Sequence, residues 1–249
     1  SITRPLRAIA RAAGVIATGN LDAPLPEAAS EDEVGMLTEA FASMTRSLKG
    51  YIARLTETVA VKERIQSELS IARKIQMSIL PKKFPALADK GAIDIFAAIS
   101  PAKEVGGDFY DFHHIDKDRM CFVVGDVSGK GVPASLFMAV TKTFLKATVS
   151  REDAPEKVLA IVNKELSSGE DQSLFVTVFF GIINIRTGEV FYTNGGHNNP
   201  VIVRMSGDAV FVKPVGGMVI GLLEDVTFDA GKFVLEPGEL LFLYTDGVT

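Results

Sequence analysis

The chain has 249 residues, of which 47% are hydrophobic and 23% are charged. It is therefore long enough for a large domain with a helical extension, and its composition excludes a disordered protein. The formal net charge of −5 argues against a nucleic-acid-binding protein, because such proteins rely on neutralising phosphates. Residues 1–90 carry 13 Lys and Arg against 10 Asp and Glu, whereas residues 91–249 carry 13 against 21. This uneven charge indicates two units.

Cys121 is the only cysteine, so a disulfide framework is excluded and a reducing compartment is expected. Because Cys121 lies in an apolar run, we expect a buried thiol rather than a nucleophile. No apolar run reaches the roughly 18–20 residues that a membrane span needs, and no signal peptide is recognisable. The chain begins abruptly at Ser1 and ends abruptly at Thr249, so we expect both ends to be cuts in a longer protein.

The first 20 residues predict a helix. Apolar residues recur every three or four positions from Leu6 to Ile16, which gives one helical stripe. Gly19 ends this helix, and residues 21–30, with two prolines, form a connector. Ser30 and Glu33 then resemble a capping box, which predicts the start of a second helix.

The second predicted helix is much longer. Its apolar residues follow the spacing of a coiled-coil seam, with a four-residue step that resembles a stutter. The seam residues are Val34, Leu37, Phe41, Met44, Leu48, Ile52, Leu55 and Val59. Helical character continues to Leu80, where Pro81 forces a stop.

Two short helices joined by a connector containing Gly and Pro resemble a HAMP domain. The matching residues are Pro5, Gly19-Asn20-Leu21, Asp32-Glu33-Val34-Gly35, Phe41 and Met44. The resemblance implies a homodimer formed through the HAMP domain and a parallel coiled coil. It also implies an upstream transmembrane sensor that this chain lacks, and hence a place on the cytoplasmic side of the bacterial inner membrane. An ordinary coiled-coil dimerisation stalk is the alternative.

From about residue 92 the pattern changes to short runs rich in Val, Ile and Phe, bounded by Gly, Asp or Pro. These predict strands at 93–99, 119–126, 175–185, 189–194, 200–205, 227–235 and 239–245. Helical patterns occur at about 133–149 and 155–167. Strands gathered around a helical pair predict an α+β sandwich rather than a regularly alternating parallel fold.

Three acidic clusters lie at the edges of these strands, each next to glycine. They are Gly106-Gly107-Asp108-Phe109-Tyr110-Asp111, Gly125-Asp126-Val127-Ser128-Gly129-Lys130-Gly131 and Tyr244-Thr245-Asp246-Gly247. A single Asp-Gly pair is usually only a turn. Carboxylates that converge from separate strands, however, repel one another unless a cation lies between them, and hard divalent ions prefer such oxygen ligands. Two such ions can lower the pKa of a shared water and hold a phosphoryl group.

Five motifs in this order resemble the SpoIIE/RsbU class of PPM (type 2C-like) protein phosphatases, over residues 64–249. Besides the three acidic clusters, they are the helix Glu68–Pro81 and the run Thr193-Asn194-Gly195-Gly196-His197-Asn198-Asn199-Pro200. The resemblance implies a PPM-type αββα sandwich and two divalent metal ions, Mn²⁺ or Mg²⁺. It further implies attack of metal-bound hydroxide on phosphoserine or phosphothreonine, with no phosphoenzyme. The implied substrate is a phosphorylated STAS-type anti-sigma-factor antagonist.

The resemblance also assigns roles to single residues. Asp126 matches the carboxylate that bridges the two metals, and the carbonyl of Val127 matches the backbone ligand beside it. Asp246 matches a second metal-bound carboxylate. Asp108 matches an acid that acts on a metal directly or through bound water, and Asp111 is a weaker candidate.

Two further residues are candidates for contact with substrate. His197 could touch substrate or protonate a leaving alkoxide, although we favour a role in shaping its loop. Lys103 could meet a phosphate, although a solvated surface lysine is the default.

One departure from the family concerns the end of the chain. The family has a further metal-binding aspartate in an Asp-Asp-x-Thr-like segment beyond the Thr-Asp-Gly motif, and this chain stops at Thr249. We therefore expect a phosphatase domain that lacks its C-terminal edge, with one metal position weak or empty and with this truncated chain inactive by itself. The expected division is a HAMP domain at 1–50, a coiled-coil transmission helix at 51–89 and the phosphatase domain at 90–249.

Two other functions compete with this prediction. A catalytically silent module that only binds its partner, a pseudophosphatase, would retain the fold, although the three aspartates argue against it. A diguanylate cyclase is suggested by Gly106-Gly107-Asp108-Phe109, but its GGDEF signature needs an acid where this chain has Phe109. The cyclase would also leave the two downstream motifs unexplained.

Overall fold

The structure is a computed structural model that describes residues 3–24, 27, 32–82, 93–100, 104–168 and 174–248. The chain divides into two compact units, Ser1–Glu68 and Leu69–Thr249. The boundary falls inside one long helix, so the last part of that helix belongs to the second unit. The two units are described separately below.

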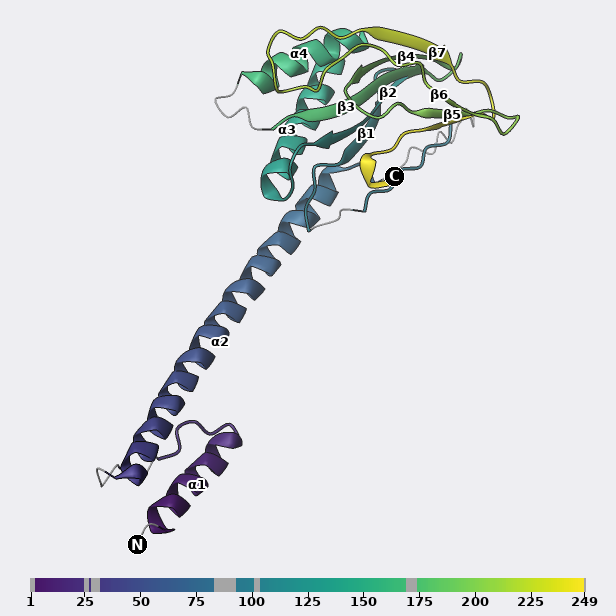
Figure 1. The fold of residues 1–249 in the computed structure, drawn as a ribbon. Helices are drawn as coiled ribbons and strands as arrows, with labels where there is room; N and C mark the ends of the chain where they lie inside the picture. The colour runs from purple at the N-terminus through teal and green to yellow at the C-terminus, as the bar shows by residue number, and fades with distance from the viewer. Residues whose placement is uncertain are drawn as a thin grey trace. The chain divides into compact units, whose positions relative to one another are not determined.

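The first unit contains α1 (Thr3–Ala17) and the beginning of α2 (Glu33–Ile79) (Figure 1). Ile9 of α1 is buried, in agreement with the predicted stripe. The Asp32 carboxylate accepts hydrogen bonds from the backbone amides of Val34 and Gly35, both at 3.1 Å, and so it caps α2. Ser30, the predicted cap, lies outside the described residues.

The seam predicted along α2 is largely uncovered in the single chain. Its exposed members include Leu37, Met44, Leu48, Ile52, Leu55 and Val59. The helix ends at Ile79, as the proline at 81 predicts. None of the described helices is both long and apolar enough to cross a membrane.

The second unit is built on a five-stranded antiparallel sheet with the order β1-β2-β3-β4-β7. Its strands are β1 (Phe109–His114), β2 (Arg119–Val127), β3 (Val176–Asn184), β4 (Glu189–Gly195) and β7 (Ala230–Val234). A smaller antiparallel sheet has the order β6-β5-β8, with β6 (Ala209–Phe211), β5 (Val201–Val203) and β8 (Leu240–Phe242).

The two faces of the larger sheet have different neighbours. Helices α3 (Val132–Val149) and α4 (Pro155–Ser167) pack against one face (Figure 1). On this side Val178 and Phe180 of β3 belong to the main core. Phe179, between them, points to the other face and packs with Ile202 of the smaller sheet, because successive strand side chains alternate. The layers confirm the predicted α+β class.

The predicted elements differ from the structure in three places. Residues 93–99 alternate between partly buried and exposed side chains, yet they form no strand. Two of the partly buried residues, Ile93 and Ile95, pack against a cluster of buried residues that includes Val190. The apolar alternation therefore reflects burial and not pairing with a neighbouring strand. Strands β1 and β6 were not predicted, since β1 lies inside an acidic motif and β6 is very short.

Candidate active site

Three acidic residues from separate stretches of chain approach one another at one end of the larger sheet. Asp108 directly precedes β1, and Asp126 is the next-to-last residue of β2. The antiparallel register pairs Phe109 with Gly125, which places Asp108 opposite Asp126. Asp246 follows β8 and begins the short 3-10 helix η1 (Asp246–Val248).

Glycines permit the close approach of these segments. A Cβ at Gly107 would lie 2.5 Å from the Val127 carbonyl oxygen, so only glycine lets this backbone lie against Val127. Gly131 has a φ of 83°, a conformation that favours glycine. There the chain leaves the Asp126 motif and enters α3.

The pKa values of the site carboxyl groups are shifted because these groups lie close together and are partly buried. Burial, followed by repulsion from Asp108 and Asp246, raises the pKa of Asp126 to about 6. Burial is also the main cause of the raised pKa of Asp108, which hydrogen bonds to Thr245 and to Asp126. A hydrogen bond between two carboxyl groups requires a proton that the pair shares. The site therefore favours a positive charge between these carboxylates.

The donors suit a hard divalent cation. The Oδ1 atom of Asp108 is buried without a hydrogen-bond partner among the described residues, which is costly unless another group binds it. The Val127 carbonyl borders the same segment, and carboxylate and carbonyl oxygens are the ligands that Mg²⁺ and Mn²⁺ prefer. Among the residues described, however, no three acidic, histidine or cysteine side chains converge on one metal-sized point. The arrangement is a carboxylate pair with Asp246 close enough to act on it.

His197 joins β3 to the segment that leads to Asp246. Its Nε2 lies 3.1 Å from the Tyr244 carbonyl oxygen, and its Nδ1 lies 2.9 Å from Oγ1 of Thr177. Because a carbonyl can only accept, Nε2 carries the proton and Thr177 donates to Nδ1. Burial lowers the pKa of His197, which keeps the ring neutral. These contacts link β3 to the backbone that precedes Asp246, and the role of His197 in shaping its loop stays a prediction.

Asp111 has a different partner. Its Oδ2 lies 2.9 Å from Nζ of Lys142, and both side chains are buried. Lys142 also donates to the Ile79 carbonyl at the end of α2, at 2.8 Å. The pair thus links β1, α3 and α2. A role for Asp111 in substrate binding stays a prediction, and Lys103 lies outside the described residues.

Three further residues, for which the sequence predicts no role, hydrogen bond to the segments that carry the candidate site residues. Thr245 hydrogen bonds to Asp108, and Thr177 contacts His197. The third, Gln76 in α2, hydrogen bonds to Gly106. Thr177 lies in an apolar run, Gln76 in a helical run and Thr245 beside Asp246 in an acidic motif. None of these patterns by itself predicts the hydrogen-bond partner.

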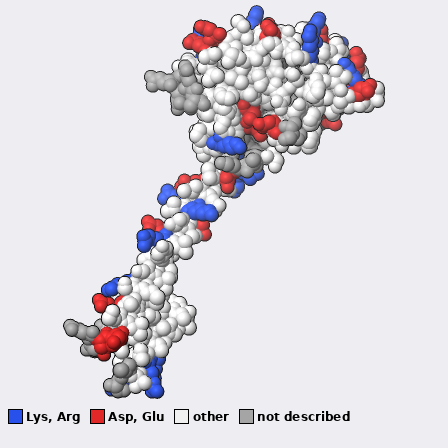
Figure 2. Space-filling view, in the orientation of Figure 1, with Lys and Arg blue, Asp and Glu red and all other residues white. Residues whose placement is uncertain are grey.

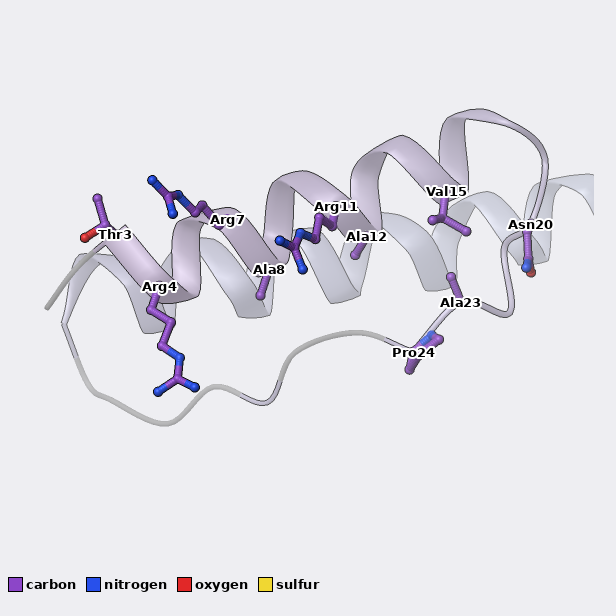
Figure 3. A pocket seen from close by; sticks show the side chains of 10 residues that line it. All are labelled: Thr3, Arg4, Arg7, Ala8, Arg11, Ala12, Val15, Asn20, Ala23 and Pro24. Carbon is purple, nitrogen blue, oxygen red and sulfur yellow. The ribbon is translucent and has the colours of Figure 1, made fainter.

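A separate hollow lies in the first unit. It measures about 800 Å³ and is lined by α1 and the connector that follows it (Figure 3). Its charged lining consists of Arg4, Arg7 and Arg11, and it contains none of the candidate site residues.

On the molecular face of Figure 2, the described Lys and Arg side chains are interspersed with Asp and Glu. The described residues on this face form no continuous basic patch.

Comparison with known proteins decides the family. Residues 116–249 match the family model of stage II sporulation protein E (SpoIIE). The chain belongs to the SpoIIE family. Residues 1–50 match the HAMP domain model, so both predicted resemblances are confirmed.

Relatives of this SpoIIE-family chain include phosphatases. It is 30% identical to phosphoserine phosphatase RsbU of Bacillus subtilis over 76% of this chain and 55% of that protein. It is also 30% identical to protein IcfG of Synechocystis sp., over 99% of this chain and 42% of that protein. The SiaA-PP2C domain of Pseudomonas aeruginosa has the same fold, with a TM-score of 0.61 at 20% identity, over 73% of this chain and 72% of that one. The chain thus spans about half the length of these two sequence relatives.

Proposed function

We propose that this protein is a metal-dependent phosphatase that removes phosphate from phosphoserine or phosphothreonine of a regulatory protein. The observation that carries this proposal is the pairing of Asp108 with Asp126 beside the Val127 carbonyl. A partly buried carboxylate pair with an unpartnered oxygen is destabilising by itself, and a bound cation would stabilise it. The relatives named phosphoserine phosphatases, RsbU and RsbP of Bacillus subtilis, support the same reaction.

The proposed metal-binding groups are Asp126, the Val127 carbonyl, Asp246 and Asp108. Two divalent ions, Mn²⁺ or Mg²⁺, would supply a water of lowered pKa and positive charge for the phosphoryl oxygens. The oxygen of a water molecule then forms a bond to phosphorus, the phosphorus–oxygen bond to the serine breaks, and the serine oxygen takes up a proton. No protein nucleophile is needed, which agrees with the raised pKa of Cys121.

The residues of the chain would hold this chemistry in place. Asp108 and Asp126 fix the position of the positive charge from adjacent strands, whose register is set by backbone pairing. His197 ties the backbone at Tyr244 to Thr177 of β3, and so it fixes the approach of Asp246. Preorganised groups of this kind need not reorganise during the reaction.

The substrate we propose is a phosphorylated STAS-type anti-sigma-factor antagonist, by analogy with the SpoIIE/RsbU class. We further propose that the HAMP domain at 1–50 and the transmission helix at 51–89 regulate the phosphatase domain at 90–249. The exposed apolar seam of α2 supports a parallel homodimer. The HAMP match supports a place on the cytoplasmic side of the cell membrane, next to a transmembrane sensor.

Hydrolysis of a phosphorylated STAS-domain protein by the intact protein tests the proposal. Phosphate release should require Mn²⁺ or Mg²⁺. Its rate should fall by about 100-fold or more in Asp126→Ala, because this variant loses a proposed metal-binding carboxylate and with it charge stabilisation of the transition state. Binding of the phosphoprotein without release above the Asp126→Ala control would instead identify a pseudophosphatase.

A further inference from the structure

Gln76 is a buried polar residue near the end of a helix whose surface is otherwise mostly exposed. Its side chain is only 5% exposed, although glutamine is usually found at the surface. The amide nitrogen donates to the Gly106 carbonyl at 2.5 Å, and the amide oxygen accepts from the Gly106 backbone N–H at 3.3 Å. One side chain therefore satisfies both backbone groups of one residue, as a neighbouring strand would do.

Gly106 stands at the start of the segment that builds the carboxylate site. Gly107 follows it and lies against Val127, whose carbonyl oxygen would be 2.5 Å from an added Cβ. The next residue, Asp108, hydrogen bonds to Asp126. The backbone that Gln76 holds is thus two residues from a proposed metal ligand. A shift of Gly106 would move both Asp108 and the backbone packed on Val127.

Neighbouring contacts hold the end of α2 in one rotational setting. Leu80 belongs to the main core, and Met77 packs against it. The hydroxyl of Tyr110 donates to the Pro81 carbonyl at 3.2 Å, and Lys142 donates to the Ile79 carbonyl at 2.8 Å. These contacts lie on either side of Gln76. Its amide therefore reaches Gly106 only when the last turns of α2 keep this rotation about the helix axis.

We propose that Gln76 is a positioning residue for the metal site, acting through its two hydrogen bonds to Gly106. This inference rests on the proposed phosphatase function and adds to it the residue that connects the helix to the site. A purely structural Gln76 would lower stability alone. A positioning Gln76 also changes the Mn²⁺ affinity of the folded protein, which a loss of stability alone does not.

The test compares Gln76→Met with wild type in the intact protein. Methionine has a similar volume but leaves both groups of Gly106 unpaired. We expect the dissociation constant for Mn²⁺, measured by calorimetry without substrate, to rise at least about 10-fold, in the range seen when groups that orient metal ligands are removed. Amide hydrogen exchange of the segment at 104–108 should become faster, and excess Mn²⁺ should restore most of the turnover rate.

Gln66→Met is the matched control, because Gln66 is an exposed glutamine of the same helix. It should leave Mn²⁺ affinity and exchange at wild-type values. If Gln76→Met does not fold, Gln76→Glu replaces it, since glutamate can still accept from the Gly106 N–H but cannot donate to the carbonyl. Mn²⁺ affinity within two-fold of wild type in the folded variant would overturn the proposal. A wild-type protein that binds Mn²⁺ but hydrolyses no phosphoprotein would overturn only the phosphatase function, and one that binds no Mn²⁺ would overturn both.

Discussion

The surroundings of Asp126 oppose its ionisation, and this has a consequence for stability. The pKa of Asp126 is raised from 3.8 to about 6 in the folded protein, chiefly by burial. Between these values the folded state binds more protons than the unfolded state, so stability is full below about pH 4 and falls as the pH rises to about 6. Because the carboxyl group is half-buried, we expect the free energy of unfolding to fall by about 1 kcal/mol over this pH range, after allowance for solvent screening. Urea unfolding of the metal-free protein between pH 4 and pH 7 measures it.

Two controls separate this effect from other titrations. Asp126→Asn carries no titrating group at this position, so its stability should vary less over the same pH interval. Added Mn²⁺ should oppose the loss in wild type, because a ligand that binds only the folded state stabilises it. An equal pH dependence in wild type and Asp126→Asn would contradict the assigned cause.

Cys121 gives a second residue-level prediction. Burial raises the pKa of its thiol to about 12, so almost no thiolate exists in the folded protein at pH 8. We expect iodoacetamide to leave the native protein unmodified over hours and to alkylate it rapidly in urea, as mass spectrometry would show. Cys121→Ser should retain phosphatase activity. Rapid alkylation of the native protein would show that the thiol is accessible.

At the level of elements, the ion pair between Lys142 and Asp111 joins β1 to α3 inside the domain. The Nζ–Oδ2 distance is 2.9 Å and both groups are buried. Removal of one partner leaves an uncompensated buried charge, so Lys142→Met should cost about 3–5 kcal/mol of unfolding free energy. The double variant with Asp111→Asn should cost less than the sum of the two single variants.

The same cycle tests the role predicted for Asp111. If Asp111 only balances Lys142, the folded double variant should keep a turnover rate within a few-fold of wild type. If Asp111 touches substrate or metal, the double variant should lose turnover even where its unfolding free energy has recovered.

Elements could be predicted best where the conformational preference of a single residue type marks their beginning or end. Helices α3 and α4 agree with prediction to within a residue, because proline marks the first turn of each. The approach of Asp108 to Asp126 could be predicted because each lies beside glycine at a strand edge, whereas the sharing of one metal ion with Asp246 stays a prediction. The contact of Gln76 with Gly106 could not be predicted, since it spans 30 positions of the chain and depends on where a helix end packs. The run at 93–99 has the apolar alternation of a strand but forms none, because alternation reports burial and not pairing.

For the whole molecule, the main feature is one continuous helix that contributes residues to both units. Helix α2 runs from Glu33 to Ile79; its first part carries an exposed apolar seam, and its last part carries Gln76. A seam of this kind is expected to bind the same seam of a second copy. The rotation of α2 about its axis in the dimer then determines the direction in which Gln76 points, because both are fixed by the same helix backbone.

Insertions in α2 test this linkage. Two residues inserted after Ala60 rotate the following helix by about 200°, whereas seven residues change its phase by only about 20°. We expect the two-residue insertion to change the rate of Mn²⁺-dependent phosphoprotein hydrolysis at least about five-fold and the seven-residue insertion to leave it within about two-fold. Size-exclusion chromatography with light scattering should show a dimer in both. Equal rates in dimers of both phases would mean that the seam and the active site work independently, and that Gln76 holds the site without transmitting the state of the helix.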